Sequence, residues 1–526
     1  MAILSGILQV LIFPSPSLYF LCWIALAPLI IAILRARDQD AVQLLAEGGS
    51  SYLAPASLRQ GFLLGYASGI VWYLGTCYWI YHTMHVYGGV NSFFSVVLLV
   101  LFALYLALYH GLFGVLLAIS ARKRQGYSLR ALVLAPFLWV SVELARTYIT
   151  GFPWDLLGTA QVNNVPLARI ATFTGVYGVS FEIALVNAAF AAAALVARRQ
   201  RVTMLIAAVC ASVGLQVWQL VPMQAPPPDR YATLVQENLP LNDVHWDEQK
   251  ESEVLQDLEK FSVAPKNASA ENPGLIVWPE SPAPFFVTDY HFRGMMIQIA
   301  RERNSYVIAG SLGIENTGRE DVQPDLFNSA VLITPDGKWT ARYDKNHLVP
   351  FGEYIPFQSM LSFAKSLTHE VGSFKAGHDR KLLSLGKNHA GTFICYESIF
   401  PDEVRLFADN GADLFINISD DGWYGETGAP GQHLNMARMR AIENQRWLLR
   451  STNTGITAAI DPFGRVVMSA PRNVRAYMQA PFAYVTEKTF YTEHGDWFPI
   501  LCVIISLLAL IVRQGPAAQV TEPQPV

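Results

Sequence analysis

Residues 391–400 read GTFICYESIF, a short apolar run that ends at Cys395 and is followed by a Tyr-Glu pair. No other cysteine lies between residues 211 and 501. A run of Thr, Phe and Ile that stops at polar residues is typical of a buried β-strand. The stretch therefore predicts a strand that carries a single thiol at its end. Taken alone, such a thiol is more often a small buried apolar group than a nucleophile.

Six further runs between residues 232 and 464 have the same Val/Ile/Phe-rich character and end at Gly, Pro, Asn or Asp: ATLVQENL, GLIVWPES, SYVIAGSLGI, SAVLITPDG, DLFINISDD and GITAAIDPFG. Four segments between these runs have a helical pattern: DEQKESEVLQDLEKF, FRGMMIQIARER, PDEVRLFAD and QHLNMARMRAIENQRWLL. Strands that alternate with helices predict an α/β domain. We place this domain at residues 225–493, after the proline-rich linker QAPPPDR.

The rest of the chain predicts a membrane protein. Hydrophobic residues make up 52% of the chain and charged residues only 15%, which is too apolar for an ordinary soluble protein. Runs of about 17 to 25 apolar residues can cross a bilayer as helices. We expect eight spans, of which the first is the shortest, near residues 2–14, 17–34, 60–83, 92–120, 129–149, 176–197, 202–221 and 497–513. Residues 1–224 are then a bundle of seven spans, and residues 494–526 hold the eighth span and a tail.

The positions of Lys and Arg predict how the bundle is oriented, because short loops rich in these residues stay in the cytoplasm. Such residues follow every second span: Arg35, Arg37, Arg59, Arg122, Lys123, Arg124, Arg130, Arg198, Arg199, Arg201 and Arg513. Both termini are therefore expected in the cytoplasm and the α/β domain on the extracytoplasmic face. A signal peptide at residues 1–20 is the alternative, but MAILSG lacks a positive charge and no A-x-A cleavage site follows.

The charge pattern and the cysteine pattern exclude two classes of partner. The net charge is −4 and no Lys/Arg-rich tract lies outside the short loops, which argues against nucleic acid. No Cys/His spacing typical of zinc is present, so no metal is expected. Cys395 has no partner cysteine within its own domain, and an unpaired thiol in an oxidising compartment calls for an explanation.

Three segments of the expected domain end in side chains that can react. GLIVWPE ends in Glu280, WTARYDK in Lys345 and GTFIC in Cys395. Loops after the strands of an α/β fold aim side chains into a common site without interrupting the sheet. Each residue alone has a simpler interpretation: Glu280 as a solvated carboxylate and Lys345 as a surface amine. Together, an acid, an amine and a thiol predict nucleophilic catalysis.

The sequences around these residues resemble the nitrilase, or carbon-nitrogen hydrolase, superfamily and, within it, the membrane-embedded apolipoprotein N-acyltransferase family. The motifs that carry the resemblance are WVSVELARTYITGFPW (139–154), VWPES (277–281), KNHLVPFGEYIPF (345–357), CYES (395–398) and DDGWYG (420–425). The resemblance implies an α-β-β-α sandwich attached to a bundle of eight transmembrane helices. It covers nearly the whole chain.

The resemblance also implies site residues and a reaction. It makes Glu280 the general base, Lys345 the oxyanion stabiliser and Cys395 the nucleophile, and it adds the supporting residues Glu353, Tyr396, Glu397, Trp246 and Trp423. Cys395 would take an acyl chain from a phospholipid, usually phosphatidylethanolamine, and pass it to the N-terminal amine of the diacylglyceryl-cysteine of an apolipoprotein. No cofactor is implied. The expected enzyme is a monomer in the bacterial inner membrane with its catalytic domain in the periplasm.

Two loops beside these residues carry more aromatic surface than a solvated loop normally does. Their aromatic residues are Phe285, Phe286, Phe351, Tyr354 and Phe357. We interpret them as membrane-facing lids that line an acyl pocket, and packing between the domain and the spans is the alternative. Glu143 and Arg146 lie three residues apart on one predicted span, where they can pair and tie the bundle to the domain.

Two other functions are compatible with parts of this pattern. A membrane-tethered amidase would use the same three residues on small carbon-nitrogen substrates, although such substrates need no aromatic loops. A transporter with a cargo-binding ectodomain would not need Cys395. The predicted spans show no internal repeat and few ionisable residues, which argues against a transporter.

Overall fold

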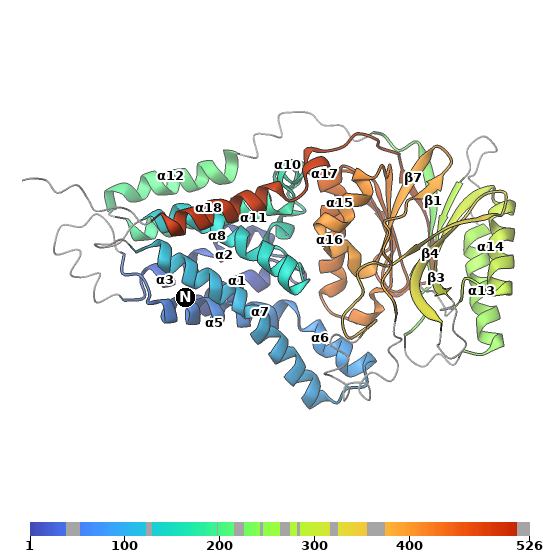
Figure 1. The fold of residues 1–526 in the computed structure, drawn as a ribbon, viewed down its shortest axis with the longest axis horizontal. Coiled ribbons are helices and arrows are strands. Elements are labelled where there is room, and N and C mark those ends of the chain that lie inside the picture. Colours follow the sequence, from blue (N-terminus) through green and yellow to red (C-terminus); the bar gives the residue numbers. More distant parts are fainter. Residues whose placement is uncertain are drawn as a thin grey trace, which may run out of the picture.

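The computed structural model describes residues 1–37, 53–122, 129–196, 198–214, 226–241, 246–263, 274–280, 285–315, 324–354 and 374–512. A helical bundle lies beside a domain of two β-sheets, and the last helix of the chain returns to the bundle (Figure 1). The α/β domain predicted from the sequence is confirmed.

The first sheet has the strand order β12-β1-β2-β3-β4-β5. Its strands are β1 (Arg230–Gln236), β2 (Gly274–Val277), β3 (Ser305–Glu315), β4 (Asp325–Ile333), β5 (Trp339–Asp344) and β12 (Ala476–Phe482). β1, β2 and β3 are parallel, and β4 pairs antiparallel with both β3 and β5. β2 and β5 therefore run in the same direction and end at the same edge of the sheet.

The second sheet has the order β11-β10-β9-β8-β7-β6. Its strands are β6 (Leu383–Leu385), β7 (Asn388–Ile394), β8 (Leu414–Ser419), β9 (Leu448–Thr452), β10 (Ala458–Ile460) and β11 (Val466–Ser469). The central strands β7, β8 and β9 are parallel and every residue of β8 is buried. Strands covered on both faces are expected to be apolar throughout, as LFINIS nearly is.

Helices cover both sheets on their outer faces. α13 (Glu248–Val263) and α14 (Tyr290–Glu302) cover the first sheet, while α15 (Pro401–Asp409) and α16 (Ala429–Asn444) lie between the second sheet and the bundle (Figure 1). One core packs α13 and α14 on the first sheet, and a second lies between the two sheets and under α15 and α16. The domain thus has four layers in the order helix, sheet, sheet, helix.

The bundle contains both long and short helices. They are α1 (Ala2–Leu11), α2 (Cys22–Ala25), α3 (Ala27–Leu34), α5 (Leu58–Thr76), α6 (Trp79–His82), α7 (Ser92–Ser120), α8 (Arg130–Ala145), α9 (Val165–Ala168), α10 (Ala171–Thr174), α11 (Val176–Leu195), α12 (Arg198–Gly214), α17 (Phe490–His494) and α18 (Trp497–Ile511). Within the described ranges, three helical segments are long and apolar enough to cross a membrane: Ser92–Ser120, Arg130–Thr150 and Val176–Leu195. Four other apolar helices are shorter: Ala2–Leu11, Tyr19–Leu34, Gln200–Ala211 and Trp497–Ile511. Three long helices support a membrane part, and the count of eight spans stays a prediction.

Glycines allow α5 and α7 to approach closely. A Cβ atom at Gly65 would lie 2.1 Å from the carbonyl oxygen of His110, and one at Gly114 would lie 2.1 Å from that of Gly61. Small residues at such crossings let two helix backbones touch, which is a main source of packing energy between membrane helices.

α16 joins the two halves of the molecule. Leu434, Ala437 and Ala441 pack into the core of the α/β domain, whereas Met436 and Met439 belong to the core of the bundle. Of its 16 residues, 14 are buried. The core of the bundle and the core of the α/β domain therefore meet at α16, without a solvent layer between them.

The predicted helix at residues 432–449 is too long. α16 ends at Asn444, since Gln445 adopts a left-handed conformation with φ 49°, and Leu448 already begins β9. Leu448 and Leu449 of RWLL are buried in this strand, where the helical pattern had predicted a final helical turn.

Candidate active site

Glu280, Lys345 and Cys395 each follow a strand, as the sequence predicted. Glu280 follows β2 and Lys345 follows β5, so both lie at one edge of the first sheet. Cys395 follows β7 of the second sheet. All three residues are buried, with exposed fractions of 7%, 1% and 6%. The facing sheets thus bring an acid, an amine and a thiol into one enclosed site.

Lys345 lies between two carboxylates. Its Nζ donates to Oε1 of Glu353 at 2.9 Å and to Oε1 of Glu280 at 3.3 Å. Asn328 connects the same two acids, because its Nδ2 donates to Glu280 at 2.7 Å and to Glu353 at 2.8 Å. Burial opposes the ammonium, but the two carboxylates outweigh it and raise the pKa of Lys345 well above its ordinary value. The two carboxylates therefore favour the charged form of Lys345.

The second oxygen of Glu280 is fixed by the backbone. Oε2 accepts a hydrogen bond from the N–H of Asp420 at 2.8 Å. Asp420 stands directly after β8, so the second sheet orients the acid that the first sheet presents. Contacts from both sheets thus fix the orientation of the Glu280 carboxylate.

Cys395 has a strained backbone and a protonated side chain. Its φ of 51° lies in the left-handed region, which a non-glycine residue rarely adopts. Such strain of about 1 to 3 kcal/mol is often held at functional sites. Burial raises the pKa of the thiol well above its ordinary value, Glu280 raises it further, and Lys345 opposes both. The raised pKa favours the protonated thiol over the thiolate.

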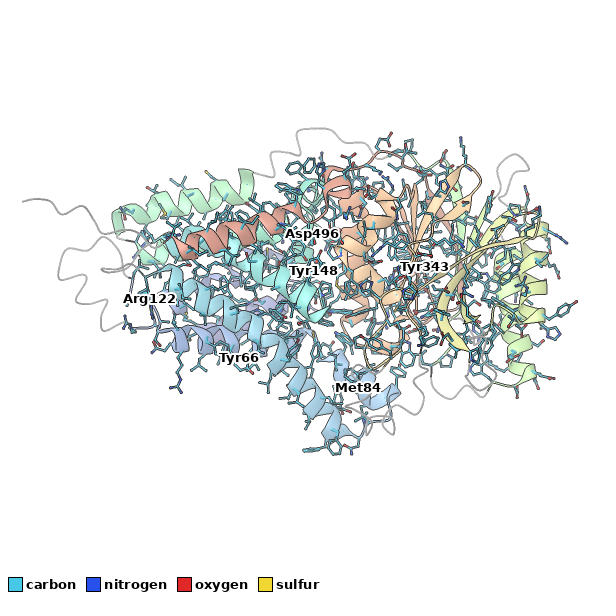
Figure 2. All side chains as sticks on the ribbon, viewed as in Figure 1. Tyr66, Met84, Arg122, Tyr148, Tyr343 and Asp496 are labelled. Atoms are coloured by element: carbon cyan, nitrogen blue, oxygen red, sulfur yellow. The ribbon has the colours of Figure 1, made fainter. Side chains whose placement is uncertain are left out.

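Glu397 fixes the turn that follows Cys395. Cys395–Ile399 forms the short 3-10 helix η7. Oε2 of Glu397 accepts from the N–H of Ile394 at 2.7 Å, and Oε1 accepts from the hydroxyl of Tyr343 at 2.7 Å (Tyr343 is labelled in Figure 2). Oε1 also accepts from the N–H of Asn346 at 2.7 Å, so one carboxylate joins the segment of Cys395 to that of Lys345.

The other supporting residues predicted from the sequence lie at different distances from this centre. The hydroxyl of Tyr396 donates to the carbonyl of Gly151 in the bundle at 3.2 Å. Trp423 is 46% exposed and contacts Tyr87 of the bundle, with 5.6 Å between the ring centroids. Trp246 packs instead against the core under α13 and α14, and no contact places it with Glu280, Lys345 and Cys395 among the residues that the structure describes.

The five predicted lipid-contact residues lie in different surroundings. Phe285 is 3% exposed and stacks on Phe292 of α14 at 5.0 Å, so it belongs to the outer core of the first sheet and not to a lid. Phe351 is 43% exposed and Tyr354 is half-buried. Phe286 is half-buried and bridges to Leu312 of β3. Phe357 lies outside the described residues.

Glu143 and Arg146 do not bond to each other. Arg146 donates to the hydroxyl of Tyr73 at 3.0 Å, and Glu143 accepts from the N–H of Leu157 at 2.7 Å. The expected pair is thus replaced by two separate contacts inside the bundle. Both side chains are nevertheless buried, with exposed fractions of 4% for Glu143 and 2% for Arg146. Each connects α8 or its end to a neighbouring segment of the bundle.

Several residues of the site were missed in the sequence. Asn328 lies inside the apolar strand β4, where a buried amide in a run such as LFNSAVLI was the available signal. Asp421, His433 and Arg450 form a second buried polar group behind Cys395, and all three have an exposed fraction of 0%. They come from three different elements, so no local pattern connects them.

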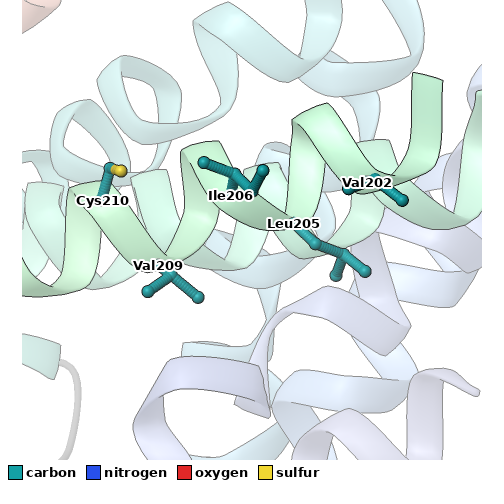
Figure 3. A pocket seen from close by; sticks show the side chains of 5 residues that line it. All are labelled: Val202, Leu205, Ile206, Val209 and Cys210. Atoms are coloured by element: carbon teal, nitrogen blue, oxygen red, sulfur yellow. The ribbon is translucent and has the colours of Figure 1, made fainter.

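Within the described residues, no group of three or more His, Cys, Asp or Glu side chains could hold a metal ion. A shallow hollow elsewhere lies on α12 and is lined by Val202, Leu205, Ile206, Val209 and Cys210 (Figure 3). Its lining contains no ionisable group other than the thiol of Cys210. Exposed apolar side chains on a bundle helix are expected where lipid covers the protein.

Comparison with known proteins assigns the chain to a family. Residues 5–189 match the family model of the apolipoprotein N-acyltransferase N-terminal domain, and residues 232–487 match that of carbon-nitrogen hydrolase. The apolipoprotein N-acyltransferase of Geobacter metallireducens is 35% identical over 514 residues, which is 96% of this chain and 92% of that protein. The chain belongs to the apolipoprotein N-acyltransferase family.

Other members of the apolipoprotein N-acyltransferase family are similar over most of their length. The Pseudomonas syringae protein is 32% identical and covers 88% of this chain and 90% of its own. An amidase of the nitrilase superfamily from Nesterenkonia aligns with 52% of this chain and 96% of its own at 18% identity and a TM-score of 0.36. Membership makes this chain a bacterial membrane enzyme of the acyltransferase class with a nitrilase-like α/β domain.

Proposed function

We propose that the protein transfers a fatty acyl chain from a membrane phospholipid to the N-terminal amine of the diacylglyceryl-cysteine of apolipoproteins. The observation that carries this proposal is the burial of Glu280, Lys345 and Cys395 in one site. The relatives that align over most of their length and most of this chain are named apolipoprotein N-acyltransferases. The reaction passes through a thioester on Cys395.

The first half-reaction loads the enzyme. Glu280 takes the proton of the Cys395 thiol while the sulfur adds to the ester carbonyl of the phospholipid. The negative oxygen that develops is stabilised by Lys345 and by the N–H of Tyr396. When the intermediate collapses, the carbon–oxygen bond to glycerol breaks and Glu280 returns the proton to that oxygen. A lysophospholipid leaves, and a thioester remains.

The second half-reaction transfers the acyl chain from the thioester to the acceptor amine. The α-amine of the lipoprotein cysteine adds to the thioester carbonyl, and Glu280 accepts a proton from the nitrogen. The carbon–sulfur bond breaks, the amide forms, and the thiolate recovers a proton. Because the pKa of Cys395 is raised mainly by burial, reprotonation of the leaving sulfur is favourable and resets the site.

Glu353 has an electrostatic role in this scheme. Glu280 alternates between charged and neutral forms in the proposed reaction. If Glu280 were the only carboxylate beside Lys345, the ammonium would lose its ionic partner at each proton transfer. Glu353, which accepts from Lys345 at 2.9 Å and from the N–H of Val349 at 2.7 Å, keeps that cation paired throughout. Trp246 and Trp423 are proposed as supporting residues that lie further from the sulfur.

The arrangement of the chain supports a membrane substrate. We propose domains at residues 1–224, 225–493 and 494–526, with eight spans and cytoplasmic termini in the bacterial inner membrane. The catalytic domain then faces the periplasm, with phosphatidylethanolamine as the donor and a monomer as the working state. The contact of Tyr396 with Gly151 supports a site that opens towards the bundle, and the exposed ring of Phe351 supports a lipid-facing loop.

Intact-mass measurement tests this function. The purified protein is mixed with phospholipid vesicles that contain phosphatidylethanolamine, and its mass should rise by one acyl chain that hydroxylamine removes. Cys395→Ala should stay unmodified, and Cys210→Ala, which removes an exposed thiol on α12, should still be acylated. Absence of the adduct, together with release of ammonia from small soluble amides, would identify an amidase instead.

A further inference from the structure

A buried polar group holds the peptide unit that follows Cys395. The ring of His433 on α16 is completely buried, and its Nε2 lies 3.0 Å from the carbonyl oxygen of Cys395 and 2.7 Å from Oγ of Ser398. Carbonyl and carboxylate oxygens can only accept, so Nε2 carries a hydrogen when it bonds to the carbonyl of Cys395, and Nδ1 carries one when it bonds to Asp421. With a hydrogen on Nε2, His433 donates to the carbonyl of Cys395.

The opposite side of the same ring is also fixed. Nδ1 lies 2.9 Å from Oδ1 of Asp421 and 3.1 Å from Nη2 of Arg450. Arg450 donates to Oδ2 of Asp421 at 2.7 Å, and its Nη1 contacts Asn417 in β8. These ionic groups are the charges that face His433 from β9 and η8 (Asp421–Tyr424). A buried ion pair with well-made hydrogen bonds holds a single geometry, so the imidazole cannot turn.

The residue before His433 connects the same helix to the bundle. Gln432 accepts from Nε1 of Trp154 at 2.8 Å and donates to the carbonyl of Pro14 at 2.7 Å. The rings of Trp154 and His433 are stacked, with 5.9 Å between their centroids. Two successive residues of α16 thus contact the bundle and the nucleophile turn, and the position of the bundle fixes the position of the imidazole.

A contact that fixes the carbonyl of Cys395 also fixes the N–H of Tyr396, because one peptide bond joins them. The carbonyl of Cys395 and the N–H of Tyr396 belong to one planar trans unit, so they point in opposite directions. Fixing the oxygen fixes the direction of the hydrogen. The N–H of Tyr396 lies in the first turn of η7, where a helix supplies no acceptor of its own. Cys395 adopts a strained φ of 51°, and the hydrogen bond to its carbonyl helps to hold it.

We propose that His433, with a hydrogen on Nε2, is a positioning residue that aims the N–H of Tyr396 at the oxyanion formed on the acyl carbonyl, and that the packing of α16 on the bundle sets its orientation. This proposal rests on the proposed role of Cys395. Without His433 the peptide unit turns more freely, and the transition state loses an aligned donor while the ground state is unchanged.

The test compares two reactions of Cys395 in the full-length protein. Acylation by phosphatidylethanolamine vesicles forms an oxyanion, whereas alkylation by iodoacetamide does not. In His433→Ala, acylation should slow by about 10²-fold, the cost of losing one oxyanion donor, with KM for the phospholipid unchanged. The alkylation rate should stay at the native value. His433→Gln keeps a side-chain N–H and should recover part of the rate, and His291→Gln on α14, which is exposed, is the matched control.

Each result decides the proposal. If the rates of acylation and alkylation fall equally in His433→Ala, His433 only maintains the fold around the thiol. If the acylation rate does not fall, His433 has no role in this step. Either result overturns the inference. If His433→Ala fails to fold, His433→Gln and Gln432→Ala carry the same comparison, with a selective loss of acylation expected in each. Acylation that persists in Cys395→Ala would overturn the proposed function itself, independently of His433.

Discussion

Cys395 and its neighbours show how burial sets the order of events at the level of single residues. A thiol whose pKa is raised by burial is a weak nucleophile at rest. In the proposed reaction the proton therefore leaves as the sulfur attacks, and the buried carboxylate of Glu280 is available for that transfer. Lys345, held by two carboxylates, compensates their charge and is proposed to present its ammonium to the developing oxyanion. Acid, amine and thiol thus depend on one another.

Glu280→Gln tests the base. An amide cannot accept the thiol proton, so the rate at which the acyl adduct forms should fall by about 10²- to 10⁴-fold, the usual contribution of a general base. Alkylation of Cys395 should slow as well, because it needs the same deprotonation. Glu302→Gln, at the exposed end of α14, should leave both rates unchanged. A native acylation rate in Glu280→Gln would exclude the base role.

Asp420 predicts a pH dependence of stability. Burial raises its pKa to about 7, although hydrogen bonds from Asn453 and Gly422 oppose the shift, while an unfolded aspartate titrates near about 3.9. Between these values the folded state keeps a proton that the unfolded state has lost. The free energy of unfolding should therefore fall as the pH rises through this window, by at most about 1.4 kcal/mol per pH unit.

Asp420→Asn should reduce that fall. The measurement is the apparent melting temperature in detergent at several pH values between about 4 and 7, and the slope against pH is compared between the two proteins. A residual slope should remain, since burial also raises the pKa of Glu397 and of Glu443 to about 7. Identical slopes for the native protein and Asp420→Asn would show that this carboxyl does not carry the proton.

The residues that the sequence identified, and those it did not, differ in a physical respect. Glu280 and Cys395 end apolar runs, so strand patterning alone places them at loops, whereas Lys345 ends the mixed segment WTARYDK. The flanking motifs identify all three residues together. Asn328 and His433 lie inside regular elements, where a polar residue among apolar ones has no sequence signal that separates a ligand from a core contact. Their roles depend on which sheets and helices meet, and that information is tertiary.

At the level of elements, the approach of α5 and α7 is the most specific prediction. Gly65→Ala places a Cβ atom 2.1 Å from the carbonyl oxygen of His110, so the helices must separate. Overpacking of this kind costs about 1 to 3 kcal/mol, and the apparent melting temperature should drop. Gly294→Ala on α14 meets no atom within 4 Å, and as a helix-interior glycine replaced by alanine it should raise stability slightly. Equal effects of the two substitutions would contradict the close crossing.

Element types were largely predictable and their limits were not. Each of the seven runs first identified as strands overlaps one, because the runs combine β-branched residues with Gly, Pro, Asn or Asp. β5 was not among these runs, although its segment WTARYDK had been noted, and β6, β9, β11 and β12 were missed. β6 has three residues, β11 is exposed along its whole length, and β9 was absorbed into a helical pattern. Short or exposed strands are stabilised by pairing with neighbours, which periodicity does not record.

At the level of the whole molecule, the orientation in the membrane is open to a direct test. Tyr231→Cys, at an exposed position of β1, should react with a membrane-impermeant maleimide in intact spheroplasts. Arg59→Cys, at an exposed position of α5, should react only after permeabilisation. Four of the five native cysteines are buried, so the background is small. Labelling of Arg59→Cys in intact cells would reverse the proposed topology.

The absence of a solvent-facing side on α16 has a practical consequence. One face of α16 belongs to the core of the α/β domain and the other face to the core of the bundle. Removing this helix would therefore expose both cores. Detergents that penetrate between protein halves should inactivate this enzyme well before they unfold its sheets, and secretion of the catalytic half alone should yield aggregates. Mild, bulky amphiphiles or lipid nanodiscs are therefore the appropriate medium for handling it.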